Sequence, residues 1–175
     1  MSSDFPAIPG FYQALFLYFE PVSAAFPAFA IWFFPGAQWF HNQLVSTENP
    51  ISGSLDARTT MALCQLGNCY MLLGLSSWLV FRAVRDALPN DPRAQERIVG
   101  AGLTSLALGD VMHIAGSWSA LPDDIRYSVS SWDWMTHANT TFVIILLSIR
   151  LAWFAGIGRT RYYYGTLPQK AVKAA

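Results

Sequence analysis

The chain has 175 residues and a net charge of zero; 53% of the residues are hydrophobic and only 13% are charged. A soluble domain carries roughly 25% charged residues, so the composition excludes an ordinary water-soluble protein and indicates a membrane protein. The neutral charge gives no reason to expect a nucleic-acid partner or an acidic substrate. The length is that of one domain, and we expect a single all-α transmembrane domain over residues 1–175.

Four apolar stretches are long enough to cross a hydrocarbon core of roughly 30 Å, which takes about 20 helical residues. We predict membrane spans at residues 8–34, 59–84, 98–121 and 132–153. Pro21 and Pro27 each remove a backbone donor from the first span, which should be kinked near its middle. Residues 38–56 are expected to form a polar connection. In a five-span alternative, the kinked first stretch or the Trp39 region is split.

Loop charges predict the orientation. Four arginines lie within residues 82–97 and four basic residues follow Gly158, whereas the other two connections hold one arginine each. The positive-inside rule then places both termini in the cytoplasm, and we expect an integral membrane protein of the endoplasmic reticulum. Arg150 is expected to reach the membrane surface from the end of the fourth span. The tail from Gly158 is expected to fray.

No motif for a metal or a cofactor is evident. Cys64 and Cys69 are five residues apart, which places them on different helix faces and predicts small buried thiols without a disulfide. The sequence contains no glycine-rich phosphate loop and no haem or flavin motif. We therefore expect neither a metal nor a cofactor.

Ionisable side chains inside the spans are the candidate functional residues, because a charge at mid-bilayer costs about 2.5–3.5 kcal/mol. Glu20 lies near the centre of the first span. Asp110 and His113 are three residues apart and so share a helix face. Each also has a structural interpretation: Glu20 could bond a carbonyl freed by Pro21, and Asp110 with His113 could tie helices together.

The remaining polar residues are expected to line one cavity that opens toward the lumen and ends at the two carboxyls. His137 and Asn139 point in different directions, so at most one of them should face it. Gln65 and Asn68 share a face and could equally form interhelical hydrogen bonds. The predicted catalytic residues are Glu20, Asp110, His113 and His137. The predicted substrate-binding residues are Gln65, Asn68, Tyr70, Trp118, Trp134 and Asn139.

Acid–base chemistry on an apolar substrate suits such a site. A protonated carboxyl can activate an epoxide, an alkene or a carbonyl, while a second carboxylate or an imidazole deprotonates the nucleophile. Aromatic walls would exclude water and could stabilise a developing cation. The expected ligands are therefore a lipophilic small molecule and membrane lipid. Separately, the glycine-rich faces of the spans would permit a homodimer.

Three short motifs carry a family resemblance: Phe19-Glu20-Pro21, Gly109-Asp110-Val111-Met112-His113, and Trp132-Asp133 with His137 and Asn139. Over residues 10–155 the layout resembles small fungal integral membrane proteins of secondary-metabolite gene clusters. These include meroterpenoid cyclases and the epoxide hydrolase/cyclases of aurovertin- and citreoviridin-type polyketide pathways. The resemblance implies that a pair of membrane acids, here Glu20 and Asp110, initiates epoxide opening by proton transfer.

The short chain favours the polyketide-epoxide branch, since many meroterpenoid cyclases have about seven spans. The layout is also similar to the sterol-isomerase-like four-helix fold. We therefore predict a membrane-bound epoxide hydrolase/cyclase without a cofactor. Two alternatives stay open: a terpene cyclase that acts on a prenyl epoxide, and a lipid- or sterol-binding protein without catalysis.

Overall fold

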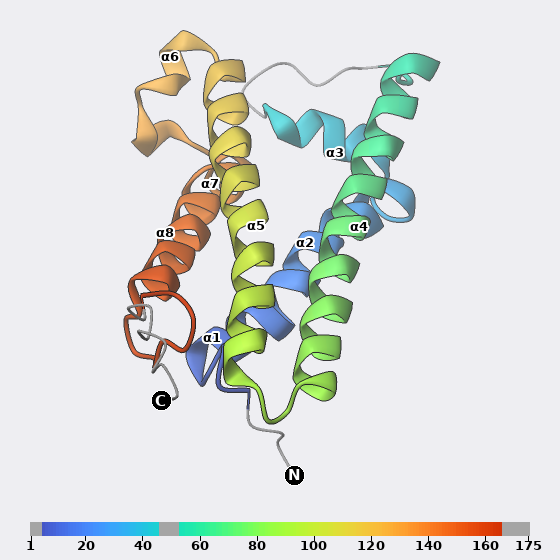
Figure 1. Cartoon of the computed structure of the whole chain (residues 1–175). Helices are drawn as coiled ribbons and strands as arrows, with labels where there is room; N and C mark the ends of the chain where they lie inside the picture. Colours follow the sequence, from blue (N-terminus) through green and yellow to red (C-terminus); the bar gives the residue numbers. More distant parts are fainter. Residues whose placement is uncertain (1–4, 46–52, 166–175) are drawn as a thin grey trace, which may run out of the picture.

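The computed structural model describes residues 5–45 and 53–165, and the regular structure within them is entirely helical. Four helical segments are long and apolar enough to cross a membrane: Phe11–Trp32, Ala57–Ala87, Pro92–Ala120 and Trp134–Ala155. The predicted all-α bundle of four spans is confirmed (Figure 1). Its exposed residues are largely apolar, as expected of a surface that meets lipid.

The first span departs from α-helical geometry just before Glu20. It consists of α1 (Phe11–Gln13), a π-helical stretch η1 (Ala14–Phe19) and α2 (Glu20–Trp32). The Glu20 N–H donates to the carbonyl of Leu15, five residues back. Pro21 follows in the first turn of α2, where a missing N–H is tolerated. Pro27 lies inside α2 without ending it.

The connection after the first span contains a short helix, α3 (Ala37–Leu44), where a polar loop was expected. Ala37, Phe40 and Leu44 follow the i, i+3, i+7 spacing of an apolar helix face. Phe40 is buried beside Ile31 at the end of α2. At 8 residues α3 is too short to cross a bilayer, so the described residues do not support a fifth span.

The two longest helices form a hairpin. They are α4 (Ala57–Ala87), capped by Asp56, and α5 (Pro92–Ala120), capped by Asp91. The buried face of α4 includes Gly67, Gly74 and Phe81, seven residues apart, and it packs along α2. A side chain at Gly74 would lie 2.6 Å from the carbonyl oxygen of Pro21. The glycine therefore permits the close approach of α2 and α4.

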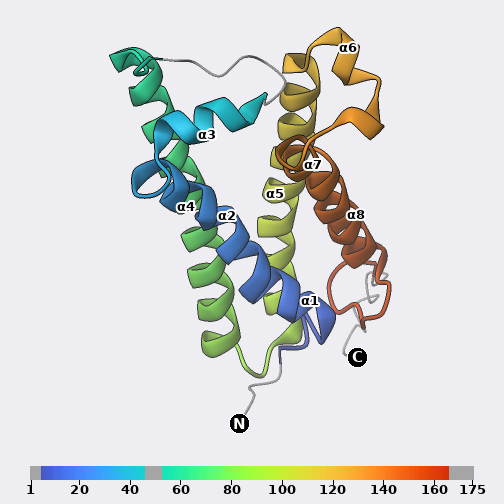
Figure 2. The same ribbon diagram turned by 180° about the vertical axis from the view of Figure 1, so that it is seen from behind.

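The fourth span is broken near its beginning. It follows α6 (Asp123–Arg126) and a short 3-10 turn, η2 (Val129–Ser131), and consists of α7 (Trp134–Asn139) and α8 (Thr141–Ala155). Thr140 separates the two helices with φ −119° and ψ −65°. α3 and α6 lie at one end of the bundle, and α1 lies at the other with the α4–α5 turn (Figures 1 and 2). We call these the α3–α6 end and the α1 end.

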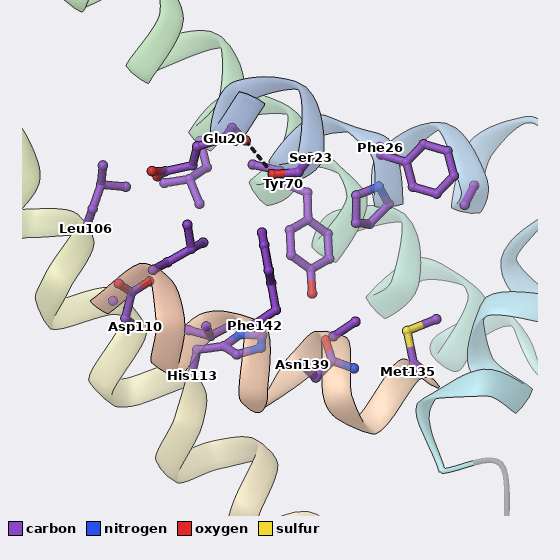
Figure 3. A pocket seen from close by; sticks show the side chains of 18 of the residues that line it. Glu20, Ser23, Phe26, Tyr70, Leu106, Asp110, His113, Met135, Asn139 and Phe142 are labelled. Atoms are coloured by element: carbon purple, nitrogen blue, oxygen red, sulfur yellow. Dashed lines mark hydrogen bonds between the residues drawn. The ribbon is translucent and has the colours of Figure 1, made fainter. Parts of the chain in front are cut away.

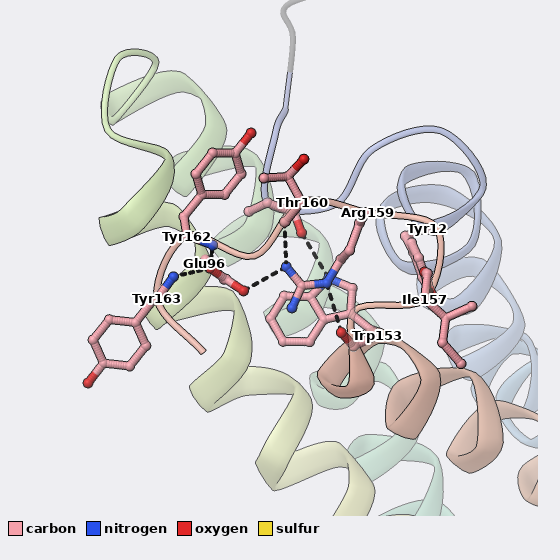
Figure 4. A network of polar contacts seen from close by, with 9 residues as sticks. Tyr12, Glu96, Trp153, Ile157, Arg159, Thr160, Tyr162 and Tyr163 are labelled. Carbon is pink, nitrogen blue, oxygen red and sulfur yellow. Dashed lines mark hydrogen bonds and ion pairs between the residues drawn. The ribbon is translucent and has the colours of Figure 1, made fainter. Parts of the chain in front are cut away.

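The segment after α8 is packed against the α1 end, so the prediction that the tail frays from Gly158 is wrong through residue 165. The Arg159 Nη1 donates to Glu96 Oε1 at 2.6 Å, and its guanidinium lies 3.8 Å from the centre of the Trp153 ring. The backbone N–H groups of Tyr162 and Tyr163 donate to the other Glu96 oxygen (Figure 4). This buried ion pair joins α5 to the C-terminal segment. Lys170 and Lys173, used in the orientation argument, lie outside the described residues.

Two of the four glycines of α5 lie against other parts of this chain, and the other two border cavities. A side chain at Gly100 would collide with Tyr164, and one at Gly102 would touch Phe81, whereas a Cβ added at Gly109 or Gly116 would meet no atom within 4 Å. Gly109 and Gly116 instead border cavities described below. The positions of these glycines give no support to a homodimer, which stays a prediction.

The two cysteines are free, as predicted. Cys64 is half-buried, but Cys69 is exposed on α4, so the prediction of two buried thiols is wrong for Cys69. Because the membrane surrounds this part of α4, an exposed thiol here meets lipid as a small apolar side chain would.

Candidate functional site

Three charged side chains from three spans meet inside the bundle. Arg150 on α8 is 1% exposed. Its Nη1 donates to Asp110 Oδ2 on α5 at 2.7 Å, and its Nη2 donates to Glu20 Oε1 on α2. The Phe16 ring lies 5.9 Å from the guanidinium carbon. We call Glu20, Asp110 and Arg150 the triad.

The prediction that Arg150 reaches the membrane surface is wrong. α8 turns this side chain toward α2 and α5, where two carboxyls offset the cost of burying a cation. Glu20 correspondingly bonds Arg150 rather than a backbone carbonyl freed by Pro21. The sequence does carry a signal for this pairing, because Glu20, Asp110 and Arg150 are ionisable residues within predicted spans, and such residues usually pair with one another.

The triad can take up one proton, and one of its carboxylate oxygens is available to a ligand. With both carboxyls ionised it carries one net negative charge, and a single added proton makes it neutral. Glu20 Oε2 and Arg150 Nε are buried and have no hydrogen-bond partner in the described part of the chain. Because an unpaired buried polar atom is costly, a polar group of a bound ligand is a natural partner for Glu20 Oε2.

The triad lies at one end of a cavity of about 450 Å³. We call it the apolar cavity, because its walls are mainly hydrophobic and aromatic. It extends from the triad to Trp39 and Trp134, whose ring centres are 6.2 Å apart. Glu20 and Asp110 lie together at one side of it and Met135 lies at the other (Figure 3). Its apolar lining residues include Phe26, Pro27, Leu73, Leu106, Phe142, Val143 and Leu146.

Three of the predicted polar residues border the apolar cavity beyond the triad: His113, Tyr70 and Asn139. His113 lies on the same face of α5 as Asp110, as the three-residue spacing predicts. Its Nε2 is buried and has no hydrogen-bond partner among the residues described. Asn139 lies beside it in Figure 3.

His137 does not line the cavity, so the structure gives no support to its predicted catalytic role. Its Nδ1 lies 2.9 Å from the Thr141 hydroxyl, and its ring contacts Trp132 at 5.5 Å between centres. Two positions along a helix differ by about 200° in direction. Because Asn139 faces the cavity, His137 points away from it.

Gln65 and Asn68 also lie outside the cavity, so their predicted placement in a shared cavity is wrong. The Asn68 amide donates to Gln65 Oε1 at 3.0 Å, and both side chains are exposed. The face of α4 that carries Gly67 and Gly74 is the one that packs on α2. The two amides lie on other faces and satisfy each other.

The two tryptophans predicted to bind substrate differ in position. Trp134 borders the apolar cavity and is 57% exposed. Trp118 contacts Tyr127 and Trp132 in an aromatic cluster near the end of α5 and does not border the cavity. Its position suits an anchor at the membrane surface. In the described residues, no group of three or more His, Cys, Asp and Glu side chains could hold a metal ion.

The fold and this site define a class: a four-span integral membrane protein with a carboxyl–guanidinium–carboxyl triad at the end of an apolar cavity. A family model described as "Domain of unknown function (DUF7704)" matches residues 5–160, and the chain belongs to that family. The match covers all four spans, the triad and Arg159. Neither a curated protein nor a solved structure matches the chain.

Proposed function

We propose that the protein is a membrane-bound epoxide hydrolase or cyclase that opens an apolar epoxide by acid–base catalysis without a cofactor. The observation that carries this proposal is the triad: Arg150 holds Glu20 and Asp110 side by side at the end of an apolar cavity. Two carboxyls that share a site can take the two opposite roles that epoxide opening needs, one as acid and one as base.

The proton balance suits such a pair. The protonated carboxyl transfers its proton to the epoxide oxygen while the bond from that oxygen to carbon breaks. The oxygen of water, or of a hydroxyl of the substrate, forms a bond to the carbon and gives its proton to the other carboxylate. Water yields a diol, and an internal hydroxyl yields a cyclic ether. The triad ends with as many protons as it had at the start.

Arg150 is the positioning residue in this scheme. Its two terminal nitrogens hold one carboxyl each, so the acid and the base keep a constant separation while the proton changes place. Glu20 Oε2, which has no partner within the described residues, is the oxygen best placed to meet the epoxide.

The cavity supports an elongated apolar substrate. Its aromatic and aliphatic walls would exclude water from the reacting carbon and stabilise positive charge as the epoxide opens. The family resemblance of the sequence motifs favours a polyketide epoxide within fungal secondary metabolism. An endoplasmic reticulum membrane with both termini in the cytoplasm is part of the same proposal.

The test measures consumption of long-chain apolar epoxides by the full-length protein in lipid vesicles, with heavy-oxygen water as solvent. We expect diols that carry one heavy oxygen, or cyclic ethers that carry none. Asp110→Asn should abolish turnover. Glu96→Gln is the matched control, because it alters the other buried ion pair, away from the apolar cavity, and should retain turnover per folded molecule.

Two results would count against the proposal. Saturable binding of the epoxide with no change in its mass would favour the lipid-binding alternative. Conversion of prenyl epoxides but of no polyketide-like epoxide would favour a terpene cyclase.

A further inference from the structure

A second cavity of about 460 Å³ meets the apolar cavity at three shared residues, Tyr70, His113 and Asn139. It extends toward the α3–α6 end, where it is bordered by Leu44 at the end of α3 and Leu121 at the end of α5. The α3–α6 end is one of the two ends of the bundle (Figure 1). The second cavity therefore lies between the membrane surface and the middle of the bundle.

The walls of this second cavity are mainly apolar, but six of its twelve lining residues have a polar side chain. Ser117, Thr136 and Thr140 line it in addition to the three shared residues. The Thr140 hydroxyl is buried, in a residue that is 1% exposed, and it has no hydrogen-bond partner in the described part of the chain. His113 Nε2 is also buried and without a hydrogen-bond partner among the described residues, although the His113 residue as a whole is half-buried. A buried hydroxyl and a buried imidazole nitrogen without partners are groups that a small hydrogen-bonding molecule would satisfy.

We infer that the second cavity takes water and delivers it from the α3–α6 end to His113, where it meets the apolar cavity. Water has both donors and acceptors and can satisfy the Thr140 hydroxyl and His113 Nε2 in turn. The hydrocarbon core supplies no water of its own, so water has to enter the bundle from one of its ends. The use of this water as a nucleophile rests on the proposed function; the route itself does not.

The route can be tested without any substrate by the reactivity of single cysteines. The full-length protein, with Cys64→Ala and Cys69→Ala, is reconstituted in vesicles and exposed on both sides to an anionic methanethiosulfonate. His113→Cys reports on the junction of the cavities. Met112→Cys is the matched control: it lies at the same depth on α5 but is 75% exposed on the outside of the bundle.

We expect the reagent to modify His113→Cys far faster than Met112→Cys. A charge in the bilayer core is disfavoured by a factor on the order of one hundred, so a lipid-facing thiol is protected by about that factor. Asn139→Cys is a second reporter at the same junction, in case His113→Cys does not fold. Monodisperse elution and full labelling after denaturation verify each variant.

Substitutions at two glycines distinguish the two possible routes to His113. Gly116 borders only the second cavity and Gly109 only the apolar one, and neither has an atom within 4 Å of the position of an added Cβ. Gly116→Leu should therefore slow modification of His113→Cys about tenfold or more, as expected when a cavity that holds water is filled, while Gly109→Leu should leave the rate unchanged. Equal rates for His113→Cys and Met112→Cys, or protection by Gly109→Leu rather than Gly116→Leu, would overturn the inference.

Discussion

Arg150 connects two carboxyls from different spans, so its removal leaves both without their cation. Breaking a buried ion pair by removing one partner costs about 3–5 kcal/mol. We expect Arg150→Met to lower the melting temperature of the detergent-solubilised protein sharply. Arg150→Lys should recover only part of the loss, because an ammonium cannot present two terminal nitrogens to two carboxyls.

The triple variant Glu20→Leu, Asp110→Leu and Arg150→Met is the control for this prediction. Replacing a whole buried ionic cluster with apolar residues is often neutral or stabilising. The triple variant should therefore melt near the wild-type temperature while it loses turnover. If Arg150→Met melted at the wild-type temperature, the ion pairs would contribute nothing to stability.

Gly109 offers a way to fill the apolar cavity without disturbing the bundle. An added Cβ would meet no atom within 4 Å, and the residue borders the cavity beside Asp110. Gly109→Leu should reduce binding and turnover of a long-chain epoxide while the melting temperature stays unchanged. Ala115→Leu, at an exposed position of the same helix, should alter neither. Full turnover by Gly109→Leu would show that substrate binds elsewhere.

Predictions of side-chain position agree with the structure where they depend on local spacing. The rarity of charge in a membrane span identified Glu20 and Asp110, and the three-residue spacing placed His113 on the face of Asp110. Arg150, Gln65 and Asn68 were misplaced because their direction depends on how α8 and α4 are rotated about their axes. That rotation is decided by packing, such as the contact of Gly74 with Pro21, which no local pattern contains.

At the scale of helices, the contact between α2 and α4 depends on Gly74. A methyl group there would lie 2.6 Å from the Pro21 carbonyl oxygen, which is backbone and must move with its helix. Overpacking of this kind costs about 1–3 kcal/mol, so Gly74→Ala should lower the melting temperature. Gly116→Ala should leave it unchanged or raise it, since no atom opposes the added methyl group. Equal melting temperatures for the two variants would contradict the close packing of α2 on α4.

The beginning of α4 is expected to depend on pH through its capping residue. Hydrogen bonds from the Thr59 side chain, from the Thr59 N–H and from the Arg58 N–H lower the pKa of Asp56. A carboxyl whose pKa is lowered by folding stabilises the helix above its ordinary pKa, and this stabilisation is lost as the pH falls through the lowered value.

Amide exchange measures this effect. Protection of the first turn of α4, corrected for intrinsic exchange, should decline in acid for the wild type. In Asp56→Asn it should stay nearly constant with pH, because the amide still accepts a hydrogen bond but does not titrate. A decline of the same size in Asp56→Asn would assign the pH dependence to another group.

The sequence predicts where the four membrane spans lie more accurately than it predicts short helices and breaks within or between them. The predicted bounds of the four spans lie within six residues of the observed ones, because length and apolar composition are local properties. α3, the π-helical stretch before Glu20 and the break at Thr140 were not predicted. Each is decided by contacts with other elements, as when Phe40 of α3 packs beside Ile31 at the end of α2.

At the scale of the whole molecule, an even number of spans places the two ends of the described chain at the same end of the bundle (Figures 1 and 2). Arg93 and Arg97, near the α4–α5 turn, lie at this end beside Tyr163. We expect this end to face the cytoplasm. In sealed microsomes, protease added outside should remove tags from both termini. Protection of both tags would reverse the orientation, and protection of only one would contradict the four-span fold.

The central claim is that Glu20 and Asp110 act as one unit around Arg150, and the rates of epoxide opening by Glu20→Gln, Asp110→Asn and the double variant test it most directly. Residues that act as a unit are strongly non-additive. We predict that each single variant is as slow as the double variant, because an acid without its base completes no cycle. Full turnover by either single variant, or losses that multiply in the double variant, would contradict the account.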